Sequence, residues 1–239
     1  MKPLLPALLL PALLLSALLL PVSRPLAAAP PAPYVARGQE PGWQLTLQPD
    51  RLTLTMADGH HATAIRPKPR HEGDTRIYTL RLDGHPLNIA ITPKLCHDSM
   101  SGMPHPDQVT ITGFEHKLNG CGGEPAALLG HDEWVVTRIG DTAALATPAA
   151  TLQFLPEGHF AGAATCNRMV GSWALTGESL TIGQLGTTMM ACEDAAMRQE
   201  QALTKLLGQV TGFDLDESGA LVLKTPGGQT ITAKPAPKP

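Results

Sequence analysis

The chain has 239 residues, of which 16% are charged, and its formal net charge at pH 7 is −3. A mildly acidic chain without a cluster of Lys or Arg argues against a nucleic-acid-binding protein, because that binding depends on neutralising phosphates. The 23 Gly and 23 Pro, together with the few charged residues, favour compact β structure with many turns. The length suits one large domain or two small ones.

Residues 1–29 have the order of a secretory signal peptide: a lysine, a leucine-rich run and small residues at the end. The alternative is an uncleaved membrane anchor, since the apolar run is just long enough to span a bilayer. Pro6 and Pro11 would break such a helix and no basic cluster follows it, so we predict cleavage. Cleavage removes Lys2 and Arg24, which changes the formal charge from −3 to −5 and leaves no stable membrane anchor.

The first predicted domain, residues 38–124, shows the period-two pattern of half-buried strands. The strand segments are "WQLTLQ", "RLTLTMA", "RIYTLRL", "PLNIAIT" and "DQVTITG". Asp58-Gly59 and Asp83-Gly84 lie between such segments and favour tight hairpins. No part of this half shows helical periodicity, so we predict an antiparallel β-sheet or a small barrel.

The second predicted domain, residues 131–234, repeats the β pattern with one helix. "TLQFLPEGHFAGAATC" and "SWALTGESLTIG" each predict a hairpin, and "ALVLKT" and "QTITAK" predict two later strands. Residues 193–210 carry apolar side chains at helical spacing. We therefore predict an antiparallel sheet with one packed helix, a mainly β or α+β fold, and a disordered Pro-rich tail at 235–239.

Four cysteines lie outside the leader: Cys96, Cys121, Cys166 and Cys192. An even number in an exported chain indicates disulfides, and four cysteines allow three pairings. The first two and the last two are each about 25 residues apart, which favours one bond within each half. On the chain-entropy model, each bond would stabilise its domain by roughly 3.5 kcal/mol.

The second half resembles the META domain of the heat-shock protein HslJ family. The resemblance rests on Cys-Asn-Arg, Gly-Ser-aromatic, Leu-x-Ile and Thr-Thr-x-Met-Ala-Cys, and it extends from Trp134 to the last strand. One departure is Thr165, where the family usually has Gly, which implies either an ordinary backbone conformation or local strain. The resemblance implies an envelope role in tolerance of heat or antibiotics, without known chemistry.

The first half resembles a companion domain of bacterial envelope proteins that is often fused to META. The segments that carry this resemblance are "GQEPGW", "CHDSMSG" and "LNGCGG". It implies that Cys96 and Cys121 belong to one domain, in agreement with their spacing.

The stretch "CHDSMSGMPH" concentrates soft metal donors in ten residues. Thioether and imidazole groups suit copper or zinc, and the candidate ligands are His97, Met100, Met103 and His105. Against a metal site, exported cysteines are usually oxidised, and Pro104 and Pro106 stiffen the segment. We favour a loop anchored by a disulfide, with no cofactor, and keep the metal site as an alternative.

The sequence shows none of the motifs of the common hydrolases. Neither Ser99 nor Ser101 lies in a G-x-S-x-G elbow, and the chain has no H-E-x-x-H motif and no Gly-rich phosphate loop. We therefore predict that the protein is not an enzyme.

A second candidate site depends on a bond between Cys166 and Cys192. That bond would bring together a guanidinium, an amide and two hydroxyl groups, those of Asn167, Arg168, Thr187 and Thr188. They could bind a ligand or a partner loop. The alternative, which we favour, is that they bond to local backbone. We expect Met189 and Met190 to fill the core.

These features predict an exported, non-enzymatic envelope protein in the periplasm of a Gram-negative bacterium. It would act as a binding or protective module whose partner is another envelope protein or a small molecule. Two alternatives stay open: a periplasmic copper- or zinc-binding protein, and an inhibitor of a secreted hydrolase whose stapled loop enters the enzyme cleft.

Overall fold

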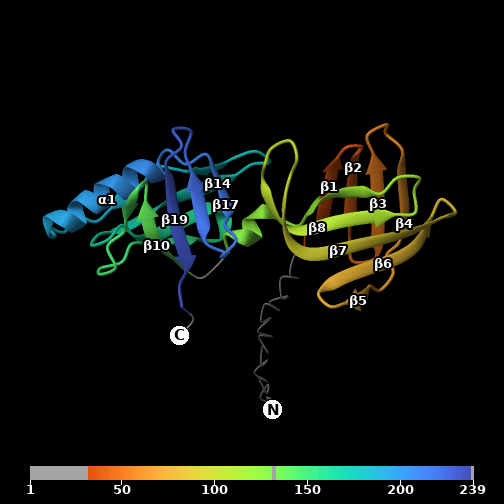
Figure 1. The fold of residues 1–239 in the computed structure, drawn as a ribbon, viewed down its shortest axis with the longest axis horizontal. Helices are drawn as coiled ribbons and strands as arrows, with labels where there is room; N and C mark the ends of the chain where they lie inside the picture. The colour runs from red at the N-terminus through yellow and green to blue at the C-terminus, as the bar shows by residue number, and fades with distance from the viewer. Residues whose placement is uncertain (1–31, 131–132, 238–239) are drawn as a thin grey trace, which may run out of the picture. The chain divides into compact units, whose positions relative to one another are not determined.

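The computed structural model describes residues 32–130 and 133–237, which form two antiparallel β-sheets (Figure 1). The predicted leader, residues 1–29, lies outside these residues. None of the helices in the described ranges has the length and apolar character needed to cross a membrane.

Nine strands within the described residues make the first sheet, in the order β4-β3-β2-β1-β9-β8-β7-β6-β5. Their bounds are β1 (Tyr34–Gln39), β2 (Gly42–Leu47), β3 (Arg51–Met56), β4 (His61–Ile65), β5 (Arg70–Glu72), β6 (Thr75–Leu82), β7 (His85–His97), β8 (Pro104–Thr112) and β9 (Leu118–Gly122). The predicted strands are all present, and β1 begins at Tyr34, before the predicted domain boundary at residue 38.

Alternating side chains build the core of the first sheet. Trp43, Leu45 and Leu47 of β2 are buried on one face, as their period of two predicts. The sheet curls so that the end of β4 meets β6, where the Arg66 guanidinium lies 5.4 Å from the centre of the Tyr78 ring. Arg66 also donates a hydrogen bond of 3.1 Å to the Tyr78 hydroxyl.

Ten strands within the described residues make the second sheet. Eight follow the order β15-β14-β13-β12-β10-β19-β18-β17, while β11 pairs with β10 and β16 pairs with β14. Their bounds are β10 (Trp134–Ile139), β11 (Thr142–Ala143), β12 (Thr151–Phe154), β13 (His159–Ala163), β14 (Arg168–Leu175), β15 (Leu180–Ile182), β16 (Gly186–Thr187), β17 (Gly212–Leu215), β18 (Leu221–Lys224) and β19 (Thr230–Pro235). The sheet forms a nearly closed barrel. Its two edge strands, β15 and β17, come close enough that the Leu180 N–H donates a hydrogen bond of 3.2 Å to the Thr211 carbonyl, just before β17.

The helix α1 (Asp194–Leu207) packs against β10 and β19, as the apolar spacing predicts (Figure 1). Its buried face includes Ala196, Leu203 and Leu207. The helix ends at Gly208, whose N–H donates to the Thr204 carbonyl at 3.2 Å. The mainly β fold with one helix in the second half is therefore confirmed.

One detail contradicts the sequence predictions, and another concerns the tail that was predicted to be disordered. Met189 and Met190 do not fill the core: they are 97% and 53% exposed, because they lie in the loop between β16 and α1. In the tail predicted to be disordered, Pro235 ends β19 and the Ala236 N–H donates to the Glu133 carbonyl at 2.9 Å. Residues 238–239 of that tail lie outside the described part of the chain.

Candidate functional site

Each half of the chain contains one disulfide. Cys96 bonds to Cys121 and Cys166 bonds to Cys192, which confirms the pairing predicted from spacing. We call residues 96–121 the first disulfide loop and residues 166–192 the second disulfide loop. Two disulfides indicate an oxidising, exported environment.

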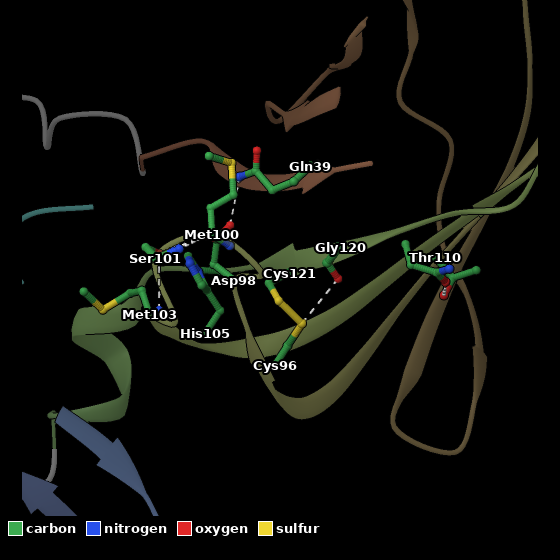
Figure 2. Close-up of a disulfide and its surroundings, with 12 residues drawn as sticks. Gln39, Cys96, Asp98, Met100, Ser101, Met103, His105, Thr110, Gly120 and Cys121 are labelled. Atoms are coloured by element: carbon green, nitrogen blue, oxygen red, sulfur yellow. Dashed lines mark hydrogen bonds between the residues drawn. A yellow bond between two sulfur atoms is a disulfide. The ribbon is translucent and has the colours of Figure 1, made fainter. Parts of the chain in front are cut away.

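A tight turn, residues 98–103, follows β7 and is organised by one carboxylate (Figure 2). We call it the Asp98 turn. One oxygen of Asp98 accepts hydrogen bonds from the Met100 N–H at 3.0 Å and from the Ser101 N–H and hydroxyl at 2.8 and 3.0 Å. The other oxygen accepts from the Gln39 amide of β1 at 2.9 Å.

These hydrogen bonds keep Asp98 ionised. Partial burial alone would raise its pKa, but the bonds from Ser101, Gln39 and Met100 outweigh it and lower the pKa from 3.8 to about 2. The turn closes at Gly102, whose φ of +69° is readily adopted only by glycine. The charge at this turn is therefore permanent at neutral pH.

The four candidate metal ligands do not share one environment. The His97 ring bonds to Asp214 at 2.8 Å, and the His105 ring bonds to the Gly123 carbonyl at 2.8 Å. Met100 is 80% exposed and Met103 is buried, and their side chains extend in different directions (Figure 2). Among residues 32–130 and 133–237, no group of three or more His, Cys, Asp or Glu could hold a metal ion.

The first disulfide loop also contacts the second sheet. Met103 is buried in the hydrophobic core that Leu129 and Trp134 help to form. The bond from His97 reaches Asp214 of β17, whose other oxygen accepts from the Lys224 ammonium at 2.9 Å. Burial would raise the pKa of Asp214, but Lys224 and His97 together hold it below its usual value. His97 and Met103, two of the four candidate ligands, therefore contact the second sheet.

A groove of about 1050 Å³ lies beside this connection. Its walls are β1, the Asp98 turn, the end of β9 with the start of the short helix η1 (Pro125–Leu128), and the loop between β14 and β15. Among the residues that line it are Arg37, Asp98, Met100, His105, Glu124 and Glu178. Three of the four predicted metal ligands thus line one groove, and His97 does not.

The second candidate cluster is held together by Asn167, which is 1% exposed. Its amide oxygen accepts from the Thr188 hydroxyl and the Met190 N–H, each at 2.8 Å. Its amide nitrogen donates to the Met190 carbonyl at 3.3 Å and to the Glu200 carboxylate at 3.1 Å. All four hydrogen-bonding positions of the amide are occupied within the domain, as the local-bonding alternative predicts.

The other members of this cluster lie around it. Arg168 and Thr187 are exposed, and the Arg168 N–H donates to the Thr188 hydroxyl at 3.1 Å. Our sequence prediction did not include Glu200, a buried carboxylate of α1 whose second oxygen accepts from the Asn167 N–H at 3.2 Å. Its position on the apolar face of the helix, between Ala196 and Leu203, is a signal that could have identified it.

The family comparison supports the resemblance of the second half to META. Residues 127–238 match the model of the META domain. This chain contains a META domain. The match begins in η1, seven residues before the predicted Trp134, and does not extend to the first sheet.

Two solved structures are similar to this chain, and no curated protein matches it. One is an NMR structure of a protein from Burkholderia xenovorans, 29% identical, with a TM-score of 0.39 over 48% of this chain and 90% of that one. The other is an NMR structure with 23% identity and a TM-score of 0.39, over 47% of this chain and 95% of that one.

Within the META domain, the backbone at Thr165 is strained and does not have an ordinary conformation; the sequence allowed both. Its φ is +145°, in the region that favours glycine. The hydroxyl donates to the Ala164 carbonyl and accepts a hydrogen bond of 2.8 Å from the Gln199 amide of α1. The side chain therefore links the start of the second disulfide loop to the helix.

Proposed function

We propose that this protein is an exported, non-enzymatic binding module of the bacterial envelope, which works in the periplasm in tolerance of heat or antibiotics. The META domain and the two disulfides support this proposal. So do the resemblances to the HslJ type and, for the first half, to an envelope domain often fused to META. The observation that carries it is the groove, because ligand sites are concave and occur preferentially where two packed units meet.

The chemistry of the groove supports binding rather than catalysis. A nucleophilic serine needs a base within hydrogen-bond distance. The Ser101 hydroxyl instead donates to Asp98 at 3.0 Å and accepts from the Met103 N–H at 3.3 Å. Asp98, with a pKa of about 2, is too weak a base to remove that proton at neutral pH.

A deletion strain tests the proposal. We expect lower survival after heat or drug exposure, restored by the wild-type gene. The variant Gly177→Trp should fail to restore it, because Gly177 lines the groove and has open space where a side chain would begin. The matched control Gly227→Trp, in the open turn between β18 and β19, should restore survival. Unchanged survival of the deletion strain under both stresses would contradict the proposal.

Copper or zinc binding is a second candidate, because Met100, Met103 and His105 line the same groove. Native mass spectrometry after copper titration should then show stoichiometric retention, lost in the variant Met100→Leu/Met103→Leu. A protein that retains no metal removes this candidate and leaves the first one unaffected.

A further inference from the structure

We propose that the groove binds a basic peptide segment, in which a Lys or Arg lies beside an apolar residue. This inference rests on the proposed binding function and names the class of its ligand. Three properties of the groove carry it: the charge of its walls, the exposed methionine at its edge and its size.

The charge of the groove is negative. Glu124 and Glu178 line it, both are exposed, and within the described residues neither carboxylate has a hydrogen bond or an ion pair. Asp98 adds a third negative charge, fixed by its hydrogen bonds. Against these stands Arg37, whose Nε–H already donates to the Gln44 amide oxygen at 3.0 Å. Two carboxylates are therefore free to meet an ammonium or guanidinium group.

Apolar side chains lie beside these charges. Met100 is 80% exposed, and Met103, Pro125 and Leu175 also line the groove. A methionine is unbranched and polarisable, so it adapts to side chains of different shape. Its exposure at the edge of a groove, next to carboxylates, matches a ligand in which an apolar group is followed by a positive charge.

The size of the groove favours a segment of chain over a small amine. Clefts for drug-sized molecules measure roughly 300–1000 Å³, and this groove measures about 1050 Å³. Its walls come from both sheets, so a ligand of several residues can contact Glu124 on one side and Glu178 on the other. The excess of carboxylates disfavours nucleic acid, whose phosphates they would repel.

Fluorescence anisotropy with the whole mature protein tests the ligand class. The probes are labelled octapeptides of alternating Leu and Lys, of Leu and Glu, and of Ser and Lys. We expect the Leu/Lys peptide to bind about tenfold more tightly than either of the others, because it alone offers both apolar and positive groups. Equal binding of the Leu/Lys and Ser/Lys peptides overturns the apolar part of the proposal. Tightest binding of the Leu/Glu peptide overturns all of it.

Matched variants test the location. Glu124→Gln/Glu178→Gln should weaken binding of the Leu/Lys peptide roughly fivefold at low salt, since each exposed ion pair contributes only modestly to affinity. The control Glu115→Gln/Glu217→Gln removes two exposed carboxylates that do not line the groove, and should change binding less than twofold. Equal losses in the two variants, or no loss in either, would show that the peptide does not bind in the groove.

A second pair of variants tests the apolar contact. Met100→Ser should weaken binding severalfold, and Ile65→Ser, at an 87% exposed position of β4, should not. The ligand class can fail separately from the function. If Gly177→Trp abolishes complementation but no basic peptide binds, the binding function stands and the peptide is wrong. If peptides bind as expected and the deletion strain survives normally, the ligand class stands and the role in tolerance of heat or antibiotics is wrong.

Discussion

The two disulfide loops place their polar side chains in different surroundings. In the second disulfide loop, Asn167 is hydrogen-bonded to the buried Glu200 carboxylate of α1, inside the META domain. In the first, Asp98 organises a turn whose exposed Met100 lines the groove, and His97 reaches the second sheet. Both loops place polar residues next to a cysteine. Asp98 and the Asn167 amide each take part in four hydrogen bonds, so the loops differ in the exposed Met100 and in the contact of His97 with the second sheet rather than in how well their polar groups are satisfied.

The largest effect that we expect is the loss of Asn167. Asn167→Ala removes the side-chain donor to the Glu200 carboxylate, which is 7% exposed, and leaves a buried charge poorly compensated. We expect the free energy of unfolding to fall by about 3 kcal/mol, measured by urea denaturation. Asn88→Ala, which removes an exposed hydrogen bond to Thr79, should cost less than about 1 kcal/mol.

A double variant sharpens this result. In Asn167→Ala/Glu200→Leu the stranded carboxylate is gone, so part of the lost stability should return. If Asn167→Ala is as stable as the wild-type protein and instead impairs binding, Asn167 belongs to a ligand site and our structural interpretation is wrong.

The next effect separates the two methionines of the first disulfide loop. Met103→Ala should lower the free energy of unfolding by about 2–3 kcal/mol, because Met103 is 4% exposed in the core of the second sheet. Met100→Ala, at an 80% exposed position, should change it by less than about 0.5 kcal/mol. Equal effects in thermal unfolding would show that the Asp98 turn does not anchor in that core.

The local features of the fold could be predicted from the sequence. The alternating burial of β2 and the apolar face of α1 follow from patterns among residues that are close in sequence. The disulfide pairing could be predicted from the spacing of the cysteines. The contact between His97 and Asp214 joins residues 117 positions apart and has no local signal. The same is true of the insertion of Met103 into the second core, and so the groove could not be predicted. Hydrophobic residue type alone predicts burial for Met189, whereas the side chain is 97% exposed because it lies in the loop before α1.

A third effect depends on pH. The folded-state pKa of Asp98 is about 2, below the ordinary 3.8, so the unfolded chain takes up its proton first as the pH falls. The stability contributed by Asp98 is therefore complete above about pH 4 and is lost between pH 3.8 and about 2. We expect Asp98→Asn to be less stable than the wild-type protein by about 1 kcal/mol at neutral pH, with the difference shrinking across that window. A difference that stays constant down to pH 2 would show that the charge of Asp98 does not stabilise the turn.

The smallest effect concerns the strained residue that opens the second disulfide loop. Thr165→Ala keeps the φ of +145° and loses the hydrogen bond from Gln199, so we expect a loss of about 1 kcal/mol. Thr165→Gly loses the same bond but adopts this φ without strain, so it should be more stable than Thr165→Ala by about 1 kcal/mol. At most positions an Ala variant is more stable than a Gly variant, since glycine increases the conformational entropy of the unfolded chain. If denaturation shows Thr165→Ala to be more stable than Thr165→Gly, the backbone relaxes at this position. The second disulfide loop would then begin without strain, as the Asp98 turn does with glycine at position 102.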